Sequence, residues 1–412
     1  MAKYNGDIPN DINNIFVNGP INAIRLEGSI NDVKKNIYLF CDYHKRVEYQ
    51  TQCPSFLSED FIRYFVRSMK KTDKNINYDL FFEVGPSFHQ GTVSNFRGKY
   101  IDEMYKFFKS SINISKTNDK IENLGSKTNS NLRLHYIDIR DYLKSFINMI
   151  ARELHEIIDN SLCKQYIYLN SLEKIEELCL VLKSEIDIII QFFDKFDKPK
   201  TRSQMRHKTQ NEKRHEIILY LLIKITEKYN DDDIKNILIK KTFFLDLIKT
   251  TFYNAYNKLD LLCISLKKYK DICNSTVKLN KTTLGDYNYG TDVNTSLNII
   301  TTLAQNINEI DFMLIKGYAY IVDLFFARRF LDKKYITHAV VYTGIAHSIV
   351  YVYLLVKYFN FSVTHVAYSK LNLIDLHKYI KKNEYDEDFT ELLIPPTFSQ
   401  CVDMTHFPPL FL

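Results

Sequence analysis

Short apolar runs that end in polar residues recur along the chain and predict the strands of a sheet. The first, residues 36–44 (NIYLFCDYH), passes from apolar side chains directly into a carboxylate and an imidazole. Residues 23–26 form a shorter apolar run before it, and Asn31-Asp32 between the two runs favours a hairpin turn. The later runs that predict strands cover residues 78–84, 132–140, 337–343 and 361–368.

Apolar residues that recur every three or four positions predict helices between these strands. Ser58 is expected to be the N-cap of the first helix, because acidic residues and then Phe61 and Phe65 follow it. From about residue 142 to residue 275 the pattern is almost wholly helical, with apolar stripes and charged faces. The other expected helices cover residues 98–109, 172–193, 216–228, 233–266, 294–331 and 348–359.

Strands that alternate with helices predict an α/β fold, in which a mixed or parallel sheet is flanked by helices. Strand patterns occur at both ends of the chain, and the helical block lies between them. The sheet is therefore expected to be built from both chain ends around a large helical insertion. The expected parts are residues 1–141 and 294–383 for the two halves of the α/β domain, 142–293 for the insertion and 384–412 for a C-terminal tail.

The composition is that of an ordinary globular protein, since 45% of the 412 residues are apolar and 25% are charged. A net charge of +6 is small for this length and does not indicate a nucleic-acid partner. The sequence has no uncharged apolar run of about 18 residues, and its first residues lack the apolar segment of a signal peptide. We therefore expect no membrane span and an intracellular, cytoplasmic location.

The seven cysteines are scattered along the chain and include no Cys-x-x-Cys pair. This spacing indicates neither a disulfide framework nor a zinc finger. A reducing compartment is therefore expected.

Two polar segments are expected to be loops. Residues 113–131 are rich in Ser, Asn, Thr and Lys, which is typical of a mobile connection. Residues 195–215 are strongly basic and contain Pro199, so a solvated loop between helices is expected there. The same basic loop is also a candidate contact for an anionic partner.

Polar residues at three strand ends provide the candidate chemistry. Asp42 and His44 follow the first strand, Glu83 closes the second, and His347 follows a late strand three residues after Gly344. The carboxyl ends of parallel strands meet at one edge of an α/β sheet, where such sheets bind ligands. There the two imidazoles and two carboxylates would suit the activation of water. His44, Glu83 and His347 would also suit a divalent metal ion.

Each of these residues also has a structural interpretation. The pair after the first strand could be solvated residues at a strand edge. Glu83 could form a buried ion pair with Arg133 or Arg140, and His347 could cap a buried turn. The first turn of a helix, where His347 is expected, disfavours an imidazolium and favours a neutral ring.

The order of these motifs resembles the superfamily that groups erythromycin esterases, haem-binding ChaN-like lipoproteins and TraB/TIKI proteins. The late Gly344-Ile345-Ala346-His347 matches the Gly-x-x-His motif of that superfamily, and Glu83 stands where its glutamate closes a strand. His44 keeps the place of the early histidine, while Cys41 and Asp42 replace glycine and glutamate. The resemblance covers roughly residues 23–140 and 294–369. The composition also resembles uncharacterised proteins of large DNA viruses of protists.

The resemblance implies hydrolysis, esterase-like or metalloprotease-like, of a small-molecule or peptide substrate. Water would be activated by His44 or His347, with Glu83 and Asp42 orienting the imidazoles or binding a divalent metal. TraB/TIKI proteins carry a Glu-Arg-Asn before the late strand, and here Arg328-Arg329 lie nearest to that place instead. Two other functions fit the sequence: a non-catalytic binding or virion-associated protein that keeps the fold, and a binder of haem or a small ligand. For a viral protein, the host cytoplasm and the virion are both expected locations.

Overall fold

The computed structural model describes residues 15–45, 53–84, 100–117, 120–126, 131–194, 210–280 and 292–408. The chain divides into two compact units. The α/β unit comprises Met1–Asp138 and Phe326–Leu412, and the helical unit comprises Ile139–Phe325. Most of the predicted basic loop, residues 195–209, lies outside the described residues, and the structure places residues 210–215 in a helix.

The α/β unit contains a six-stranded mixed sheet in the order β10-β2-β3-β9-β5-β8. β3, β9, β5 and β8 run parallel to one another, while β2 is antiparallel to both β3 and β10. Strands from both chain ends therefore form one sheet, which confirms the predicted fold class. The strands are β2 (Asn22–Ile30), β3 (Val33–Asp42), β5 (Tyr78–Phe82), β8 (Leu132–Tyr136), β9 (His338–Gly344) and β10 (Ser362–Val366).

The predicted hairpin is formed by β2 and β3, which pair from Asn22 opposite Cys41 to Ile30 opposite Val33. Asn31 and Asp32 connect them with φ angles of 49° and 64°. Asn and Asp tolerate this left-handed conformation better than most residues, so their position sets the register of the hairpin.

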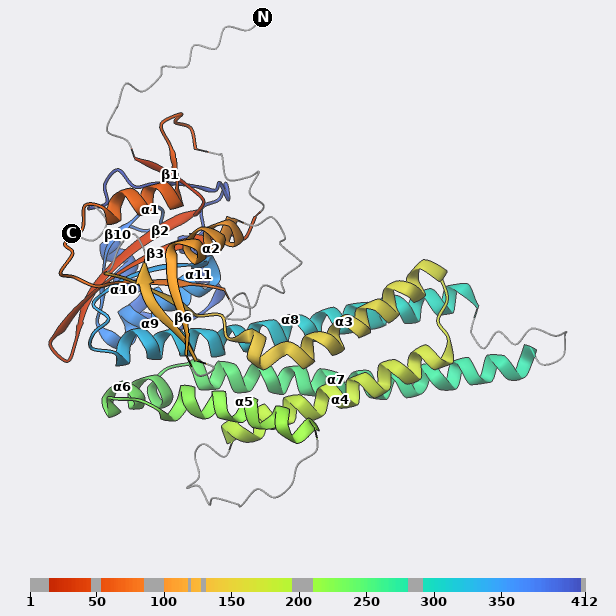
Figure 1. Cartoon of the computed structure of the whole chain (residues 1–412). Coiled ribbons are helices and arrows are strands. Elements are labelled where there is room, and N and C mark those ends of the chain that lie inside the picture. Colours follow the sequence, from red (N-terminus) through yellow and green to blue (C-terminus); the bar gives the residue numbers. More distant parts are fainter. Residues whose placement is uncertain are drawn as a thin grey trace, which may run out of the picture. The chain divides into compact units, whose positions relative to one another are not determined.

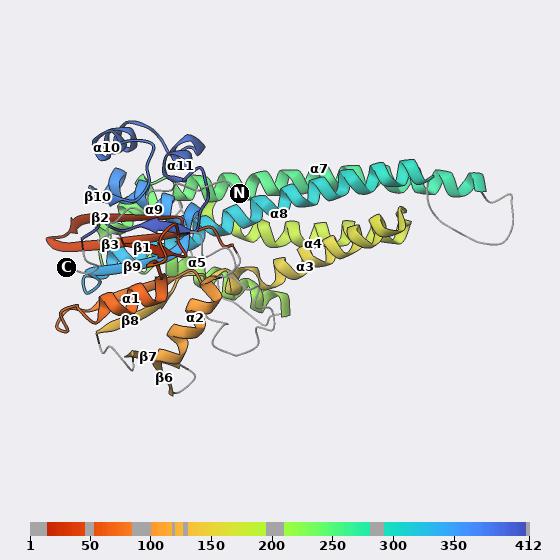
Figure 2. The same ribbon diagram turned by 90° about the horizontal axis from the view of Figure 1, so that it is seen from above.

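Helices cover both faces of the sheet, because alternate residues of each buried strand point to opposite sides. Tyr38 and Phe40 of β3 pack in one apolar core with α1 (Phe61–Met69) and α2 (Tyr100–Ser111). Cys41 faces the other way and lies near Ser348 of α9 (Ile345–Phe359). Figure 2 shows α1 and α2 along one side of the strands.

Two small sheets complete the α/β unit. β1 (Phe16–Asn18) pairs with β4 (Glu59–Asp60) and β11 (Cys401–Asp403), and β6 (Ile112–Thr117) pairs with β7 (Lys120–Ser126). A disulfide joins Cys53 to Cys401, which the scattered cysteine spacing did not indicate, so that prediction is wrong for these two residues. Cysteines 348 residues apart leave no spacing signature in the sequence.

Two further local predictions are wrong. The N-cap of α1 is Asp60, whose carboxylate accepts from the Arg63 N–H, and not Ser58. Much of the polar segment 113–131 forms the β6–β7 hairpin. The segment expected to be a C-terminal tail contains α11 (Glu387–Leu393) and β11, after α10 (Leu373–Lys382).

Long helices form the helical unit, and in both views α3, α4, α7 and α8 run lengthwise beside one another (Figures 1 and 2). Their apolar stripes supply its core, as Leu182 and Ile186 of α4 and Leu259 of α7 illustrate. No helix among the described residues is both long and apolar enough to cross a membrane. The elements are α3 (Arg140–Lys164), α4 (Leu169–Asp194), α5 (Gln210–Glu227), α6 (Asp232–Asn236), a π-helical turn (Ile237–Lys241), α7 (Phe244–Asn280) and α8 (Val293–Asp332), whose last residues belong to the α/β unit.

Candidate active site

Three adjacent parallel strands end at the same edge of the sheet and bring the predicted residues together. β9 lies between β3 and β5, so Asp42 at the end of β3 stands opposite Gly344 at the end of β9. Glu83 follows β5 directly, and its backbone N–H donates to the carbonyl of Tyr342 in β9. After β9 the polypeptide continues directly into α9, whose first turn carries His347.

Asp42, His44, Glu83 and His347 form a continuous group, named here the imidazole–carboxylate cluster. His44 Nδ1 lies 3.1 Å from Asp42 Oδ2, and its Nε2 lies 3.3 Å from Glu83 Oε2. His347 Nε2 lies 3.2 Å from the other oxygen, Glu83 Oε1. The buried glutamate therefore stands between two imidazoles.

Glu83 Oε2 also accepts two hydrogen bonds from the end of β9. The Gly344 N–H donates at 2.7 Å and the Thr343 hydroxyl at 2.9 Å. These donors hold the carboxylate in one orientation. Thr343 was missed in the sequence, because a Thr at the end of an apolar strand carries no sign that its hydroxyl meets a carboxylate from another strand.

The space at Gly344 explains why the late motif begins with glycine. A Cβ at this position would lie 2.8 Å from His44 Nε2 and 3.2 Å from Glu83 Oε2. The backbone of Gly344 has an ordinary φ of −53°, so any L-residue could adopt it. Glycine is therefore required here for the close approach of the cluster to the backbone, and not for a special conformation.

The charges of the cluster stabilise one another. Burial alone would lower the pKa of His44, but the charge of Glu83 and the bonds to Asp42 and Glu83 outweigh burial and raise it to about 10. Burial alone would raise the pKa of Glu83, but the two imidazoles hold it well below its usual value. At neutral pH His44 is therefore an imidazolium and Glu83 a carboxylate.

His44 is the member of the cluster that reaches solvent. Its side chain is 32% exposed, compared with 8% for His347 and 4% for Glu83. Its backbone adopts a left-handed conformation with a φ of 55°. Histidine adopts this conformation more readily than most residues, and here it accompanies the contacts of the ring with both carboxylates.

The predicted metal site does not follow from this geometry. Within the described part of the chain, no group of three or more His, Cys, Asp or Glu residues is arranged to hold a metal ion. The ring nitrogens of His44 and His347 face the oxygens of Glu83 instead of a shared point. The donors are therefore paired with one another, and we derive no step through a metal.

Cys41, in the early motif, is not a nucleophile in this structure. Its thiol is fully buried beneath α9, and burial raises its pKa to about 12. A thiol in that state carries almost no thiolate at neutral pH.

The predicted ion pair between Glu83 and Arg133 is wrong, because Arg133 bonds a different carboxylate. Arg133 donates to both oxygens of Asp79, at 2.8 and 2.6 Å. His135 Nε2 lies 2.6 Å from Asp79, and Arg329 donates to His135 Nδ1 at 2.9 Å. Asp79, Arg133, His135 and Arg329 are named here the arginine cluster.

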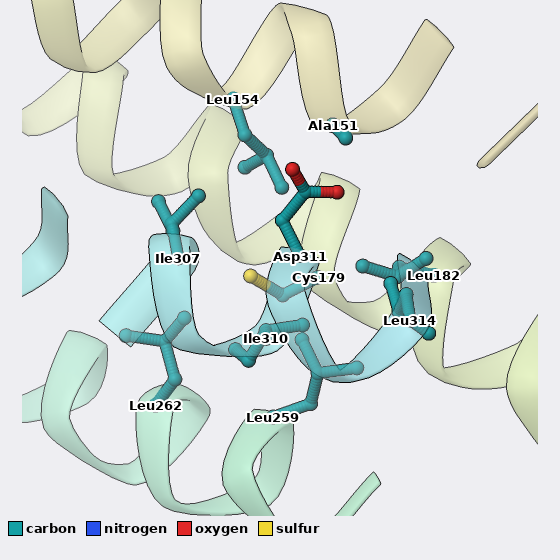
Figure 3. Close-up of a pocket in the computed structure, with 10 residues that line it drawn as sticks. All are labelled: Ala151, Leu154, Cys179, Leu182, Leu259, Leu262, Ile307, Ile310, Asp311 and Leu314. Carbon is teal, nitrogen blue, oxygen red and sulfur yellow. The ribbon is translucent and has the colours of Figure 1, made fainter. Parts of the chain in front are cut away.

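The helical unit contains a separate small cavity (Figure 3). Its walls are apolar apart from Asp311, whose carboxylate also faces His155 at 4.0 Å. Asp311 is the one carboxylate in the lining of this cavity. The lining residues are Ala151, Leu154, Cys179, Leu182, Leu259, Leu262, Ile307, Ile310, Asp311 and Leu314.

Comparison with known proteins shows relatives of nearly full length. The model of a family of unknown function (DUF5847) matches residues 15–412. Uncharacterized protein R706 of Acanthamoeba polyphaga mimivirus is 35% identical over 419 residues, which cover 97% of this chain and 98% of that protein. Uncharacterized protein R160 of the same virus is 31% identical over 432 residues, which cover 96% and 97%. No solved structure matches the chain.

These relatives confirm the predicted resemblance to proteins of large DNA viruses. The resemblance to erythromycin esterases and TraB/TIKI proteins stays a prediction.

Proposed function

We infer that this chain, which belongs to the family of unknown function DUF5847, is a hydrolase of carboxylic esters. The observation that carries this inference is the convergence of two imidazoles on one buried carboxylate, at the edge where parallel strands end. One of the imidazoles is partly exposed, so a substrate can reach it. The resemblance of the motifs to erythromycin esterases supports the same reaction class.

His44 is suited to donate a proton. It is protonated at neutral pH, and both carboxylates hold its ring in one orientation. The contact of its Nε2 with Glu83 is the longer of the two, at 3.3 Å, so a substrate oxygen would compete for this N–H. In an ester hydrolysis, His44 would protonate the departing alkoxide.

His347 is the candidate base. With its Nε2 proton directed at Glu83, the basic lone pair of the ring is on Nδ1. His347 would take a proton from water as the water oxygen forms a bond to the scissile carbonyl carbon. The bond from that carbon to the alkoxide oxygen then breaks as His44 supplies its proton. Exchange with solvent water returns both rings to their starting protonation.

Glu83 holds both rings and does not act as a base, because its pKa is low and its oxygens already accept from Thr343 and Gly344. Its charge favours the imidazolium that forms at each ring in turn. Asp42 orients His44 in the same way from the other side.

The test is hydrolysis of p-nitrophenyl acetate, p-nitrophenyl phenylacetate and a macrolactone by the full chain. H347N and E83Q should each lower kcat/KM for the three esters by about 10²-fold or more, because positioned acid–base groups contribute about 10²–10⁴-fold. H44N should show a loss of this size for the macrolactone, whose alkoxide needs the proton that p-nitrophenolate does not need. His406 is exposed in the same unit, so H406N is the matched control and should retain the wild-type rate. Equal rates for the wild type and all three cluster variants would overturn the proposal.

A second function is favoured by one specific observation: Glu83, which follows β5, bonds residues at the ends of two other strands, β3 and β9, as a structural brace would. In that case the chain is a non-catalytic binding protein that kept the fold. E83Q then lowers the thermal midpoint strongly and no ester is hydrolysed by the wild type. Metal analysis of the purified chain tests the remaining expectation of a divalent ion, which would appear in stoichiometric amounts and be lost in H347N.

A further inference from the structure

Backbone strain singles out a second residue near the imidazole–carboxylate cluster. Most of the described non-glycine residues with positive φ have an ordinary reason for it, since they form a hairpin turn or end a helix: Asn31, Asp32, Gln165 and Asn360. Two residues remain, His44 with a φ of 55° and Phe398 with a φ of 48°. Histidine is among the residues enriched in this conformation, whereas a bulky residue such as phenylalanine adopts it rarely, and non-glycine residues held in it gather at active sites and ligand clamps.

These two strained residues meet through Tyr43. The Tyr43 and Phe398 rings lie 4.9 Å apart between centroids, at an angle of 44°. Tyr43 is the residue directly before His44, and its side chain is 43% exposed although large aromatic groups are usually covered. An aromatic pair with one exposed and one half-buried ring therefore lies next along the chain to the histidine that we assign as the proton donor.

Lys45 braces this pair. Its Nζ lies 5.3 Å from the centroid of the Tyr43 ring and donates to the Phe398 carbonyl at 3.4 Å. One ammonium thus contacts both partners, so neither ring is held by apolar contact alone.

Phe398 is presented by an anchored segment. Its N–H donates to the Pro395 carbonyl, which closes a turn, and the carbonyl of the fully buried Gln400 accepts from the Gly19 N–H at 3.1 Å. Cys401, three residues after Phe398, is joined by the disulfide to Cys53. The ring position is therefore set in advance, which lowers the entropy lost when a ligand binds against it.

We propose that Tyr43 and Phe398 form the binding platform for a bulky apolar acyl group of the ester substrate, such as an arylacetyl group. The proposal rests on the proposed function for its substrate class, an ester with a bulky apolar side. The aromatic faces would bind that apolar group and thereby place the ester bond at the neighbouring His44. Polar small esters such as acetates lack the group that the platform recognises.

Kinetics on two esters test this specificity. The wild type should show a higher kcat/KM for p-nitrophenyl phenylacetate than for p-nitrophenyl acetate. In Y43A and in F398A this ratio should fall about tenfold, mainly through KM, because the lost contact is apolar binding and not chemistry. Y43F keeps the ring and should restore the ratio. Phe312, 67% exposed in the helical unit, offers F312A as a matched control with an unchanged ratio.

Binding can be measured without catalysis, because the chain contains no tryptophan. The F398W protein would have a single tryptophan within the platform, and its fluorescence should change on titration with phenylacetamide, which has no alkoxide to lose. Acetamide should cause no change at the same concentrations. Adding Y43A to F398W should weaken phenylacetamide binding about tenfold.

The two readouts separate this proposal from the proposed function. Ester hydrolysis with a ratio that Y43A and F398A leave unchanged overturns the platform while the hydrolase stands. Phenylacetamide binding without any ester hydrolysis overturns the hydrolase and supports the platform as a ligand site. If neither ester hydrolysis nor phenylacetamide binding is observed, both the hydrolase and the platform are overturned.

Discussion

The α/β unit contains two buried carboxylates that each contact histidine, and their surroundings differ. In the arginine cluster, Asp79 is fully buried and receives two bonds from Arg133, whose charge is permanent. In the imidazole–carboxylate cluster, Glu83 contacts His44 and His347, and both imidazoles are titratable. A proton can therefore move in the second cluster at accessible pH, while the first keeps its charges.

The difference also sets the state of each histidine. Burial lowers the pKa of His135, and the charges of Arg329 and Arg133 add to this against the effect of Asp79. The pKa of His44 is raised to about 10, because the carboxylates outweigh burial. A carboxylate next to histidine is thus not by itself a sign of chemistry. The sign is a carboxylate held by titratable imidazoles, one of which reaches solvent.

The largest expected effect is on stability at the arginine cluster. D79N removes the charge that pairs with Arg133 and with His135, and breaking a buried ion pair costs about 3–5 kcal/mol. We expect this loss in the free energy of unfolding, measured by urea titration. Because Asp79 is outside the imidazole–carboxylate cluster, the folded variant should keep its ester hydrolysis.

The matched control for D79N is an exposed ion pair. Glu103 lies 2.8 Å from Lys106 on α2, with both side chains nearly half exposed. E103Q should change the unfolding free energy by no more than about 1 kcal/mol. If D79N and E103Q have similar stabilities, the arginine cluster is not the structural element that we describe.

A smaller effect is expected at Gly344. In G344A the new Cβ meets His44 Nε2, so the ring must shift, and overpacking of this kind costs about 1–3 kcal/mol. Expressed as free energies, the loss in kcat/KM should exceed the loss in unfolding free energy, because the displaced ring is the assigned proton donor. Kinetics and thermal unfolding of the same sample measure both.

Gly317 provides a comparison for G344A. A Cβ at Gly317 would lie 2.9 Å from the Phe252 ring in the helical unit, a similar crowding without any site residue. G317A should lose stability and keep the wild-type hydrolysis rate. A wild-type rate of ester hydrolysis in G344A would contradict the role given to His44.

The strands could be predicted where short apolar runs are bounded by polar residues. The pattern over residues 36–44 ends in the polar residues that follow β3, because a buried strand must change composition where it leaves the core. The β6–β7 hairpin could not be recognised, since its polar side chains lack the alternation that marks a strand. The Cys53–Cys401 disulfide was equally hidden, because a tertiary contact alone brings its ends together.

For the candidate site, the sequence indicated the residues and their strand ends, and the structure brings them within contact distance. Their chemical role stays a prediction. The sequence could not indicate that Arg133 bonds Asp79 and not Glu83, because both acids lie on or just after β5 and only register decides between them. Phe398 gave no signal, since its position beside Tyr43 depends on how the C-terminal segment returns to the sheet.

The smallest expected effect is a pair of opposite pH dependences. The folded pKa of His44 lies above the unfolded value of about 6.5. Its contribution to stability is therefore complete below about pH 6.5 and is lost as the pH rises to about 10. The folded pKa of His135 is lowered, so its contribution is present above about pH 6.5 and is lost as the pH falls through the lowered value.

Thermal midpoints of the wild type, H44N and H135N, measured from pH 4 to pH 10, resolve the two contributions. H44N should flatten the decline on the alkaline side, because the group whose proton is lost there is gone, and should leave the acid side unchanged. H135N should flatten the acid side alone. The imidazole proton signals should agree, with the ring that disappears in H44N titrating near pH 10. If that signal titrates near pH 6.5, the carboxylates do not hold the His44 proton, and the distinction between the two clusters fails at its main point.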